Sequence, residues 1–195
     1  MFEIQEIRVE HSLAPVMTDN KQTRFSFSLK SDRRECSLRS AHIRVNGWEA
    51  EIEDQRNIIY GGPALEPLTE YTVEIEVADD AGQTAREKTA FSTGRLALPW
   101  EGAWISDPAF QVESPNSPAP LCFRRRFTAR EAVKTLRVFT TALGVYDIYL
   151  DGKRLNDDYF APGFTNYEAD LQYTIHEIHD LPAGEHELRS GRAHV

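Results

Sequence analysis

Residues 141–167 read TALGVYDIYLDGKRLNDDYFAPGFTNY, and they decide the fold of the second half of the chain. In an extended strand Tyr146, Ile148 and Leu150 lie on one face, because successive side chains point to opposite sides. The Asp151-Gly152 pair that follows is typical of a two-residue hairpin turn, whose central positions both need positive φ. The stretch therefore predicts a β-hairpin that leads into a Pro-Gly loop rich in aromatic residues.

Three other runs in the second half alternate as half-buried strands do, at residues 121–128, 135–141 and 171–178. Together with the hairpin they have the rhythm of a jelly-roll β-sandwich. A jelly roll closes with roughly eight strands, and we find only about half that number after residue 120. The second domain is therefore predicted to be an incomplete jelly roll.

The first half shows short alternating runs separated by turn residues and no sustained helical periodicity. Strands are predicted near residues 4–9, 25–29, 41–45, 58–60, 71–77 and 89–92. The approach to Tyr71 is similar to the tyrosine corner of fibronectin type III domains, in which the hydroxyl bonds to upstream backbone. We therefore expect an all-β chain, with a fibronectin type III-like β-sandwich at residues 1–98 and the jelly roll at residues 99–195.

Several side chains of the first half have the pattern of structural rather than catalytic groups. Glu74 falls on the polar face of the strand at residues 71–77 and is expected to be solvated. The same expectation applies to Glu51, Glu53, Asp54 and the Asp79-Asp80 pair, because acid-base catalysis needs two carboxyls in opposed environments across a cleft. Trp48 follows an Asn46-Gly47 hairpin turn, so we expect it to pack across strands rather than to form a sugar platform.

The net charge of −9 is spread along the chain and would repel a phosphate backbone. The basic cluster at residues 124–126 falls in a predicted strand, and we expect it to be solvated and to counter acidic neighbours. Because of the negative net charge we expect no nucleic acid as a partner. We find neither a signal peptide nor a membrane-spanning window, so we expect no membrane partner and a cytoplasmic location. Cys36 and Cys122 fall in different predicted domains and are expected to be free thiols.

Several motifs, in their order and spacing, resemble the N-terminal domains of bacterial alpha-L-rhamnosidases. They are Ala103-Trp104-Ile105, the strand ending at Phe127, the hairpin at 141–152, Ala161-Pro162-Gly163, Asn166-Tyr167, Leu171-Gln172-Tyr173 and, earlier, Tyr60-Gly61-Gly62 and Phe91-Ser92-Thr93-Gly94. The resemblance implies a glycoside hydrolase in which these two domains precede a helical-barrel catalytic domain. Its two catalytic carboxylates would act by inversion and lie in that barrel, which these residues do not include. We therefore assign no catalytic residue and expect the chain alone to be inactive.

The resemblance also implies, for some members of the family, a calcium-dependent rhamnose site just before the central hairpin. This chain has Thr-Ala-Leu-Gly at residues 141–144, which offers few of the hard oxygen ligands that calcium needs. The residue types of a metal cluster occur together at His176, Glu177, His179 and Asp180. Side chains three positions apart in a strand, however, point to opposite faces. We therefore expect no metal and no cofactor.

The candidate contact residues, for carbohydrate or for the catalytic domain, are Asp157, Asp158, Phe164 and Tyr167. The Asp157-Asp158 pair could present carboxylates to sugar hydroxyls beside Tyr159 and Phe160. We favour the alternative, a turn with solvated acids followed by two packed aromatics. Phe164 and Tyr167 are better candidates, because they lie in a loop and loops on rigid sandwiches carry function.

The polar residues 189–195 depart from the apolar strand that the resemblance implies at this point. We therefore expect a truncated or frameshifted piece of a longer polypeptide. Its function would be to scaffold the catalytic domain, or to orient a rhamnose-containing carbohydrate for it. Two alternatives stay open, a stand-alone carbohydrate-binding module that uses the aromatics near Phe164 and a protein-interaction module built on the first domain.

Overall fold

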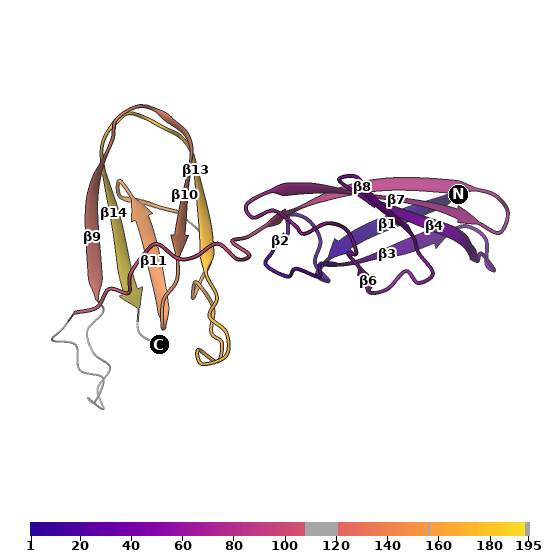
Figure 1. The fold of residues 1–195 in the computed structure, drawn as a ribbon, viewed down its shortest axis with the longest axis horizontal. Helices are drawn as coiled ribbons and strands as arrows, with labels where there is room; N and C mark the ends of the chain where they lie inside the picture. Colours follow the sequence, from indigo (N-terminus) through magenta and orange to yellow (C-terminus); the bar gives the residue numbers. More distant parts are fainter. Residues whose placement is uncertain (108–120, 156, 194–195) are drawn as a thin grey trace. The chain divides into compact units, whose positions relative to one another are not determined.

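The chain divides into two compact units, Met1–Gly102 and Ala103–Val195 (Figure 1). The computed structural model describes residues 1–107, 121–155 and 157–193. These residues form strands joined by turns and loops, with no helix among them, and so none of them belongs to a helix that could cross a membrane. The all-β class expected from the sequence is confirmed.

The first unit is a sandwich of two sheets, and each unit is described by itself. One sheet has the strand order β1-β3-β6 and the other the order β2-β8-β7-β4-β5. The bounds in the first sheet are Phe2–Val9 for β1, Arg24–Ser31 for β3 and Ile58–Ile59 for β6; in the second they are Met17–Thr18 for β2, Thr84–Thr93 for β8, Glu70–Asp79 for β7, Leu38–Val45 for β4 and Trp48–Glu51 for β5. The β2–β8 pair is parallel and the other pairs are antiparallel.

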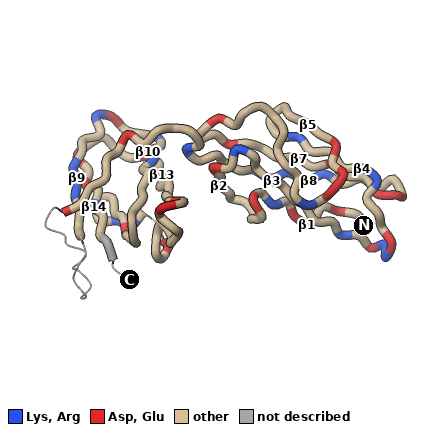
Figure 2. The backbone as a smooth tube through the Cα atoms, turned by 60° about the horizontal axis from the view of Figure 1, so that its bottom comes forward, with Lys and Arg blue, Asp and Glu red and all other residues tan. Residues whose placement is uncertain are grey.

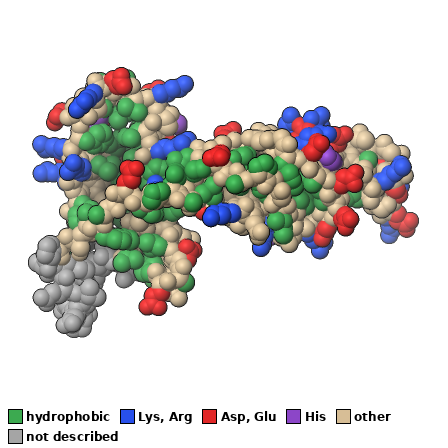
Figure 3. All heavy atoms as spheres, in the orientation of Figure 1, with side chains coloured by type: hydrophobic (Ala, Val, Ile, Leu, Met, Phe, Trp, Pro, Cys, Tyr) green, Lys and Arg blue, Asp and Glu red, His purple; other side chains and the backbone are tan. Residues whose placement is uncertain are grey.

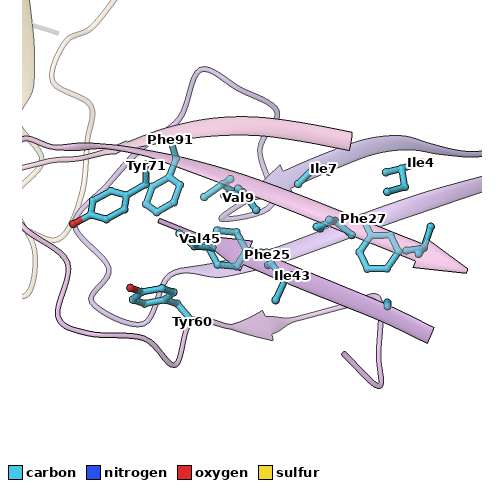
Figure 4. Packing of buried hydrophobic residues seen from close by; sticks show 14 of the residues in the cluster. Ile4, Ile7, Val9, Phe25, Phe27, Ile43, Val45, Tyr60, Tyr71 and Phe91 are labelled. Atoms are coloured by element: carbon cyan, nitrogen blue, oxygen red, sulfur yellow. The ribbon is translucent and has the colours of Figure 1, made fainter. Parts of the chain in front are cut away.

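The core of the first unit lies between its two sheets (Figure 4). Alternation along β7 buries Val73 and Ile75 completely, because every second side chain of a strand faces the same side. The Phe91 ring stacks on Tyr71 with centroids 5.3 Å apart and meets Phe25 of the facing sheet at 5.7 Å. Each such ring pair adds roughly 0.5–1.5 kcal/mol beyond the burial of its area.

A tyrosine corner closes the approach to β7, as the sequence predicts. The Tyr71 hydroxyl accepts a hydrogen bond of 2.7 Å from the backbone N–H of Glu66. The Thr93 hydroxyl donates to the Glu66 carbonyl oxygen at 2.6 Å and accepts from the Thr69 N–H at 2.9 Å. The corner is therefore tied from both the preceding loop and the last strand of the unit.

Glu74 is buried, which contradicts the expectation that it faces water. Its carboxylate forms ion pairs with Lys88, at 2.8 Å between nitrogen and oxygen, with Arg44 at 3.0 Å, and with Arg86. Arg44 and Lys88 stand directly beside Glu74 on the neighbouring strands β4 and β8, so their long side chains cover the carboxylate. The hydrogen bond from Lys88, with those from Arg86 and Arg44, lowers the pKa of Glu74 to about 2. Figure 2 shows this mixture of acidic and basic residues along the strands.

The second unit has a two-stranded sheet, β10-β13, and a four-stranded sheet of order β12-β11-β14-β9. The bounds are Val133–Thr140 for β10, Thr174–Leu181 for β13, Lys153–Arg154 for β12, Val145–Leu150 for β11, Gly184–Ala193 for β14 and Cys122–Ala129 for β9. Tyr146, Ile148 and Leu150 are all buried, as the alternation predicts. Asp151 and Gly152 both have positive φ in the β11–β12 turn, which confirms the hairpin.

The polar segment beyond residue 188 is a strand in the middle of a sheet, not a tail. β14 pairs with β11 on one side and with β9 on the other, whereas no strand is predicted there from the sequence. Residues 194 and 195 lie outside the described part of the chain. A sheet with one wet face needs apolar or neutral packing groups only at alternate positions. Leu188 and the buried His186 supply them, so polar residues at Glu187 and Arg189 do not prevent a central strand.

Candidate functional site

Exposed aromatic side chains gather on residues 157–170 of the second unit, which we name the aromatic loop. Tyr159 is 82% exposed, Phe160 66% and Phe164 88%. Figure 3 shows hydrophobic side chains at the surface of this unit. Exposed apolar groups that lie together are typical of contact sites for a ligand or a protein.

Arg154 holds the first part of the aromatic loop. Its guanidinium donates to the Asp147 carboxylate, with Nε to Oδ1 at 3.0 Å, and to the backbone carbonyl of Asp158 at 2.9 Å. The same group lies 5.7 Å from the centroid of the Tyr159 ring. The Asp147 contact raises the pKa of Arg154 further, so this anchor is charged throughout the physiological range.

The middle of the aromatic loop is fixed by Ala161 and Gly163. Ala161 is buried and its carbonyl accepts from the Tyr146 N–H of β11 at 3.0 Å, while the Gly163 N–H donates to the Phe160 carbonyl at 2.9 Å. Gly163 has a φ of +113°, and a Cβ there would overlap the side-chain oxygen of Gln172. Glycine is thus required at this position by backbone conformation, whereas the flexible end of the Gln172 side chain could move aside.

The last part of the aromatic loop is bonded to itself. The Thr165 hydroxyl donates to the Asp170 carbonyl at 2.6 Å, and the Ala169 and Asp170 N–H groups donate to the Asn166 carbonyl at 2.9 Å. The Phe164 ring meets the Tyr167 ring edge to face, with centroids 5.6 Å apart. Phe164 is therefore held in an exposed position by a built loop.

The structure brings Phe164 and Tyr167 of the predicted contact residues together, and it leaves Asp157 and Asp158 exposed at the start of the loop. The expected solvated acids are thus in place. The two aromatics that were expected to pack after them do not, because Tyr159 and Phe160 are mostly exposed. Tyr159 and Phe160 lie between the Arg154 contact at Asp158 and the buried Ala161, a tertiary constraint that the local sequence does not display.

Trp48 and the His176 group have structural surroundings. Trp48 meets Tyr60 at 4.9 Å between ring centroids and directly follows the Asn46-Gly47 turn. His176 is buried and its Nε2 lies 2.9 Å from the Thr140 hydroxyl, whereas His179 is exposed. Burial lowers the pKa of His176, which favours the neutral ring in this packing position.

Asp79, expected in water, is also buried and has a structural role. Its carboxylate accepts from the Ala81 and Gln83 N–H groups at 2.9 and 2.7 Å and from Arg33 at 3.0 Å. Cys36, Asp79 and Asp80 lie close enough to share a metal ion. Arg33 binds both acids and offsets one of their two negative charges, so these residues form a closed turn rather than an open metal site.

Two family models match the chain. Residues 4–97 match the Rha78A-like, N-terminal immunoglobulin domain, and residues 131–188 match the alpha-L-rhamnosidase N-terminal domain. Over both matched ranges the chain is similar to the N-terminal domains of alpha-L-rhamnosidases. The first model names an immunoglobulin domain where the sequence predicts a fibronectin type III-like one, and both have the sandwich architecture.

Individual rhamnosidases agree with the family models. An alpha-L-rhamnosidase of Streptomyces avermitilis is 32% identical over 94 residues, which cover 48% of this chain and 9% of that protein. One from Formosa agariphila is 24% identical over 211 residues, which cover 89% of this chain and 22% of that protein. The solved alpha-L-rhamnosidase of Dictyoglumus thermophilum has a TM-score of 0.83 at 23% identity, over 98% of this chain and 25% of that chain. The matched part of this chain thus spans about a tenth to a quarter of these relatives.

Proposed function

We propose that this chain is the non-catalytic N-terminal part of a longer alpha-L-rhamnosidase, and that it scaffolds a catalytic domain that hydrolyses terminal α-L-rhamnosides. The short span of the chain against its relatives supports the proposal. An inverting glycosidase needs two carboxyl groups roughly 6.5–9.5 Å apart on opposite sides of the sugar. Asp157 and Asp158 are instead exposed neighbours at the start of the aromatic loop. The cytoplasmic location expected from the sequence stays a prediction.

The observation that carries the proposal is the exposed aromatic loop. Phe164 stands 88% exposed on a segment whose own hydrogen bonds fix it. A preorganised aromatic loses little conformational entropy when a partner covers it, and buried aromatic anchors dominate the energy of protein interfaces. We therefore infer that Phe164, with Tyr159 and Phe160, contacts the catalytic domain of the same polypeptide.

The test compares variants of a polypeptide in which this chain precedes a rhamnosidase catalytic domain. Phe164→Ala is expected to lower the melting temperature of the catalytic domain and its kcat/KM on an aryl rhamnoside, because the anchor is lost. Ile59→Ala, which removes an exposed apolar group of the first unit, is the matched control and should change neither. Equal behaviour of both variants and the parent would contradict the scaffold contact.

Carbohydrate binding by the same loop is the second candidate function. Phe164 offers an exposed aromatic ring next to Tyr167, and the solved Streptomyces avermitilis alpha-L-rhamnosidase, with a TM-score of 0.51 over 100% of this chain, is complexed with L-rhamnose. Calorimetric titration of the isolated chain with L-rhamnose, with and without calcium, separates the two functions. A binding heat that the parent chain shows and Phe164→Ala lacks would favour carbohydrate binding. No binding heat in the parent chain would favour the scaffold.

A further inference from the structure

The outward face of the four-stranded sheet in the second unit carries an excess of arginine. Strand register puts Arg124 and Arg126 of β9 on the same face as Arg189 and Glu187 of β14, because directly paired residues share a face. Figure 2 shows basic residues along β9, and Figure 3 shows Lys and Arg side chains at the surface of this unit. The side chains of these arginines are 61%, 69% and 58% exposed, so their guanidinium groups are accessible to a ligand.

One carboxylate serves all three arginines. Glu187 lies 3.1 Å from Arg126 Nε and 3.7 Å from Arg124 Nε, and it also pairs with Arg189. Glu185, the next acidic residue of β14, accepts a hydrogen bond from the Thr128 hydroxyl of β9. This part of the sheet thus carries unbalanced positive charge in a chain whose formal net charge is −9.

A groove of about 530 Å³ lies at the same place. Its lining includes Tyr149, Arg189 and Arg124, which form one row across β11, β14 and β9 by direct pairing. Gly191 also lines the groove, and a Cβ added there would meet no atom within 4 Å. The groove therefore presents an aromatic ring, two guanidinium groups and an open strip of backbone.

We propose that this groove binds a saccharide that contains uronic acid, with a sugar ring against Tyr149 and a carboxylate at Arg124 and Arg189. Guanidinium groups bind carboxylates through two parallel hydrogen bonds, which a neutral sugar cannot form. The site is distinct from the aromatic loop, so its failure would leave the proposed scaffold function standing.

The experiment is calorimetric titration of the chain with trigalacturonate and with its fully methyl-esterified form at low and moderate salt. The ester keeps the rings and removes the charges, so we expect it to bind at least tenfold more weakly, and we expect salt to weaken the acid form. The double variant Arg124→Gln/Arg189→Gln should lose tenfold or more in affinity. Gly191→Leu should do the same by filling the groove without strain.

Arg137→Gln is the matched control, because Arg137 lies on the other sheet and pairs with Glu177. It should bind trigalacturonate as the parent chain does, and all variants should keep the parent melting temperature within a few degrees. Equal affinity for acid and ester, equal loss in the control, or no binding at millimolar saccharide would overturn the proposal. Tighter binding of oligoglutamate than of trigalacturonate would also overturn it, in favour of an acidic polypeptide partner.

Discussion

Asp151 and His186 join two distant parts of the second unit through a hydrogen bond of 2.7 Å between Oδ2 and Nδ1. The other ring nitrogen, Nε2, lies 2.9 Å from the Pro182 carbonyl oxygen. Asp151 Oδ1 also accepts from the Glu187 N–H at 2.8 Å. Both imidazole nitrogens face acceptors, and only the protonated ring donates from both. The pair therefore fastens the β11–β12 turn to β14 as an ion pair.

The stability of the second unit is expected to fall as the pH rises through the neutral range. The hydrogen bonds that His186 donates to Asp151 and to the Pro182 carbonyl raise the pKa of His186. The contribution of His186 to stability is therefore complete below the unfolded value of about 6.5 and is lost as the pH passes the raised folded value. His186 in turn lowers the pKa of Asp151, so the contribution of that carboxylate is present above about 3.9 and is lost in stronger acid. Melting temperatures from about pH 2 to pH 9 measure both flanks.

The controls for this pH profile are two histidine variants. His186→Gln cannot become charged, so its melting temperature should vary less with pH over the neutral range than that of the parent. His179→Gln changes an exposed histidine of β13 and should keep the parent profile. A neutral-range slope that survives in His186→Gln would contradict the assignment.

Tyr71→Phe is expected to reduce the free energy of unfolding of the first unit by about 1–2 kcal/mol. The substitution keeps the ring stacked on Phe91 and removes only the acceptor of the Glu66 N–H. Urea unfolding followed by tryptophan fluorescence reports on this unit when Trp100 and Trp104 are replaced by phenylalanine, so that Trp48 is the remaining fluorophore. Tyr159→Phe, at an exposed position of the aromatic loop, should lie within about 0.5 kcal/mol of the parent, and a Tyr71→Phe result equally small would show that the corner contributes little.

Gly163→Ala is expected to destabilise the aromatic loop by about 1–3 kcal/mol, because φ is +113° there. Hydrogen exchange of the Gly163 and Ala169 amides measures the local opening. Adding Gln172→Ala removes the steric overlap and leaves the backbone cost, so the double variant should recover only part of the loss. Full recovery would mean that space alone, and not backbone conformation, requires the glycine.

The sequence predicts most strands because alternation and turn chemistry are local. Tyr71 and the Asp151-Gly152 turn are examples, since corner and turn depend on residues within a few positions. Glu74 could not be placed in this way. Its burial depends on Arg44 and Lys88, which only strand register brings beside it.

The candidate site was predicted in part for the same reason. The Pro-Gly signal places Phe164 and Tyr167 in a loop, and the structure pairs their rings. The exposure of Tyr159 depends on Arg154, which reaches Asp147 on the neighbouring strand. The groove at Tyr149 could not be predicted, because it depends on the pairing of β11 with β14. The polar residues of β14 do not indicate a strand in the sequence.

The most direct test of the central claim is an assay of the 195-residue chain with an aryl α-L-rhamnoside. A non-catalytic N-terminal region should release no aryl group above the buffer rate, at any pH at which it stays folded. The same chain joined to a rhamnosidase catalytic domain should hydrolyse the substrate. Sustained turnover by the purified chain alone, proportional to its concentration, would contradict the account.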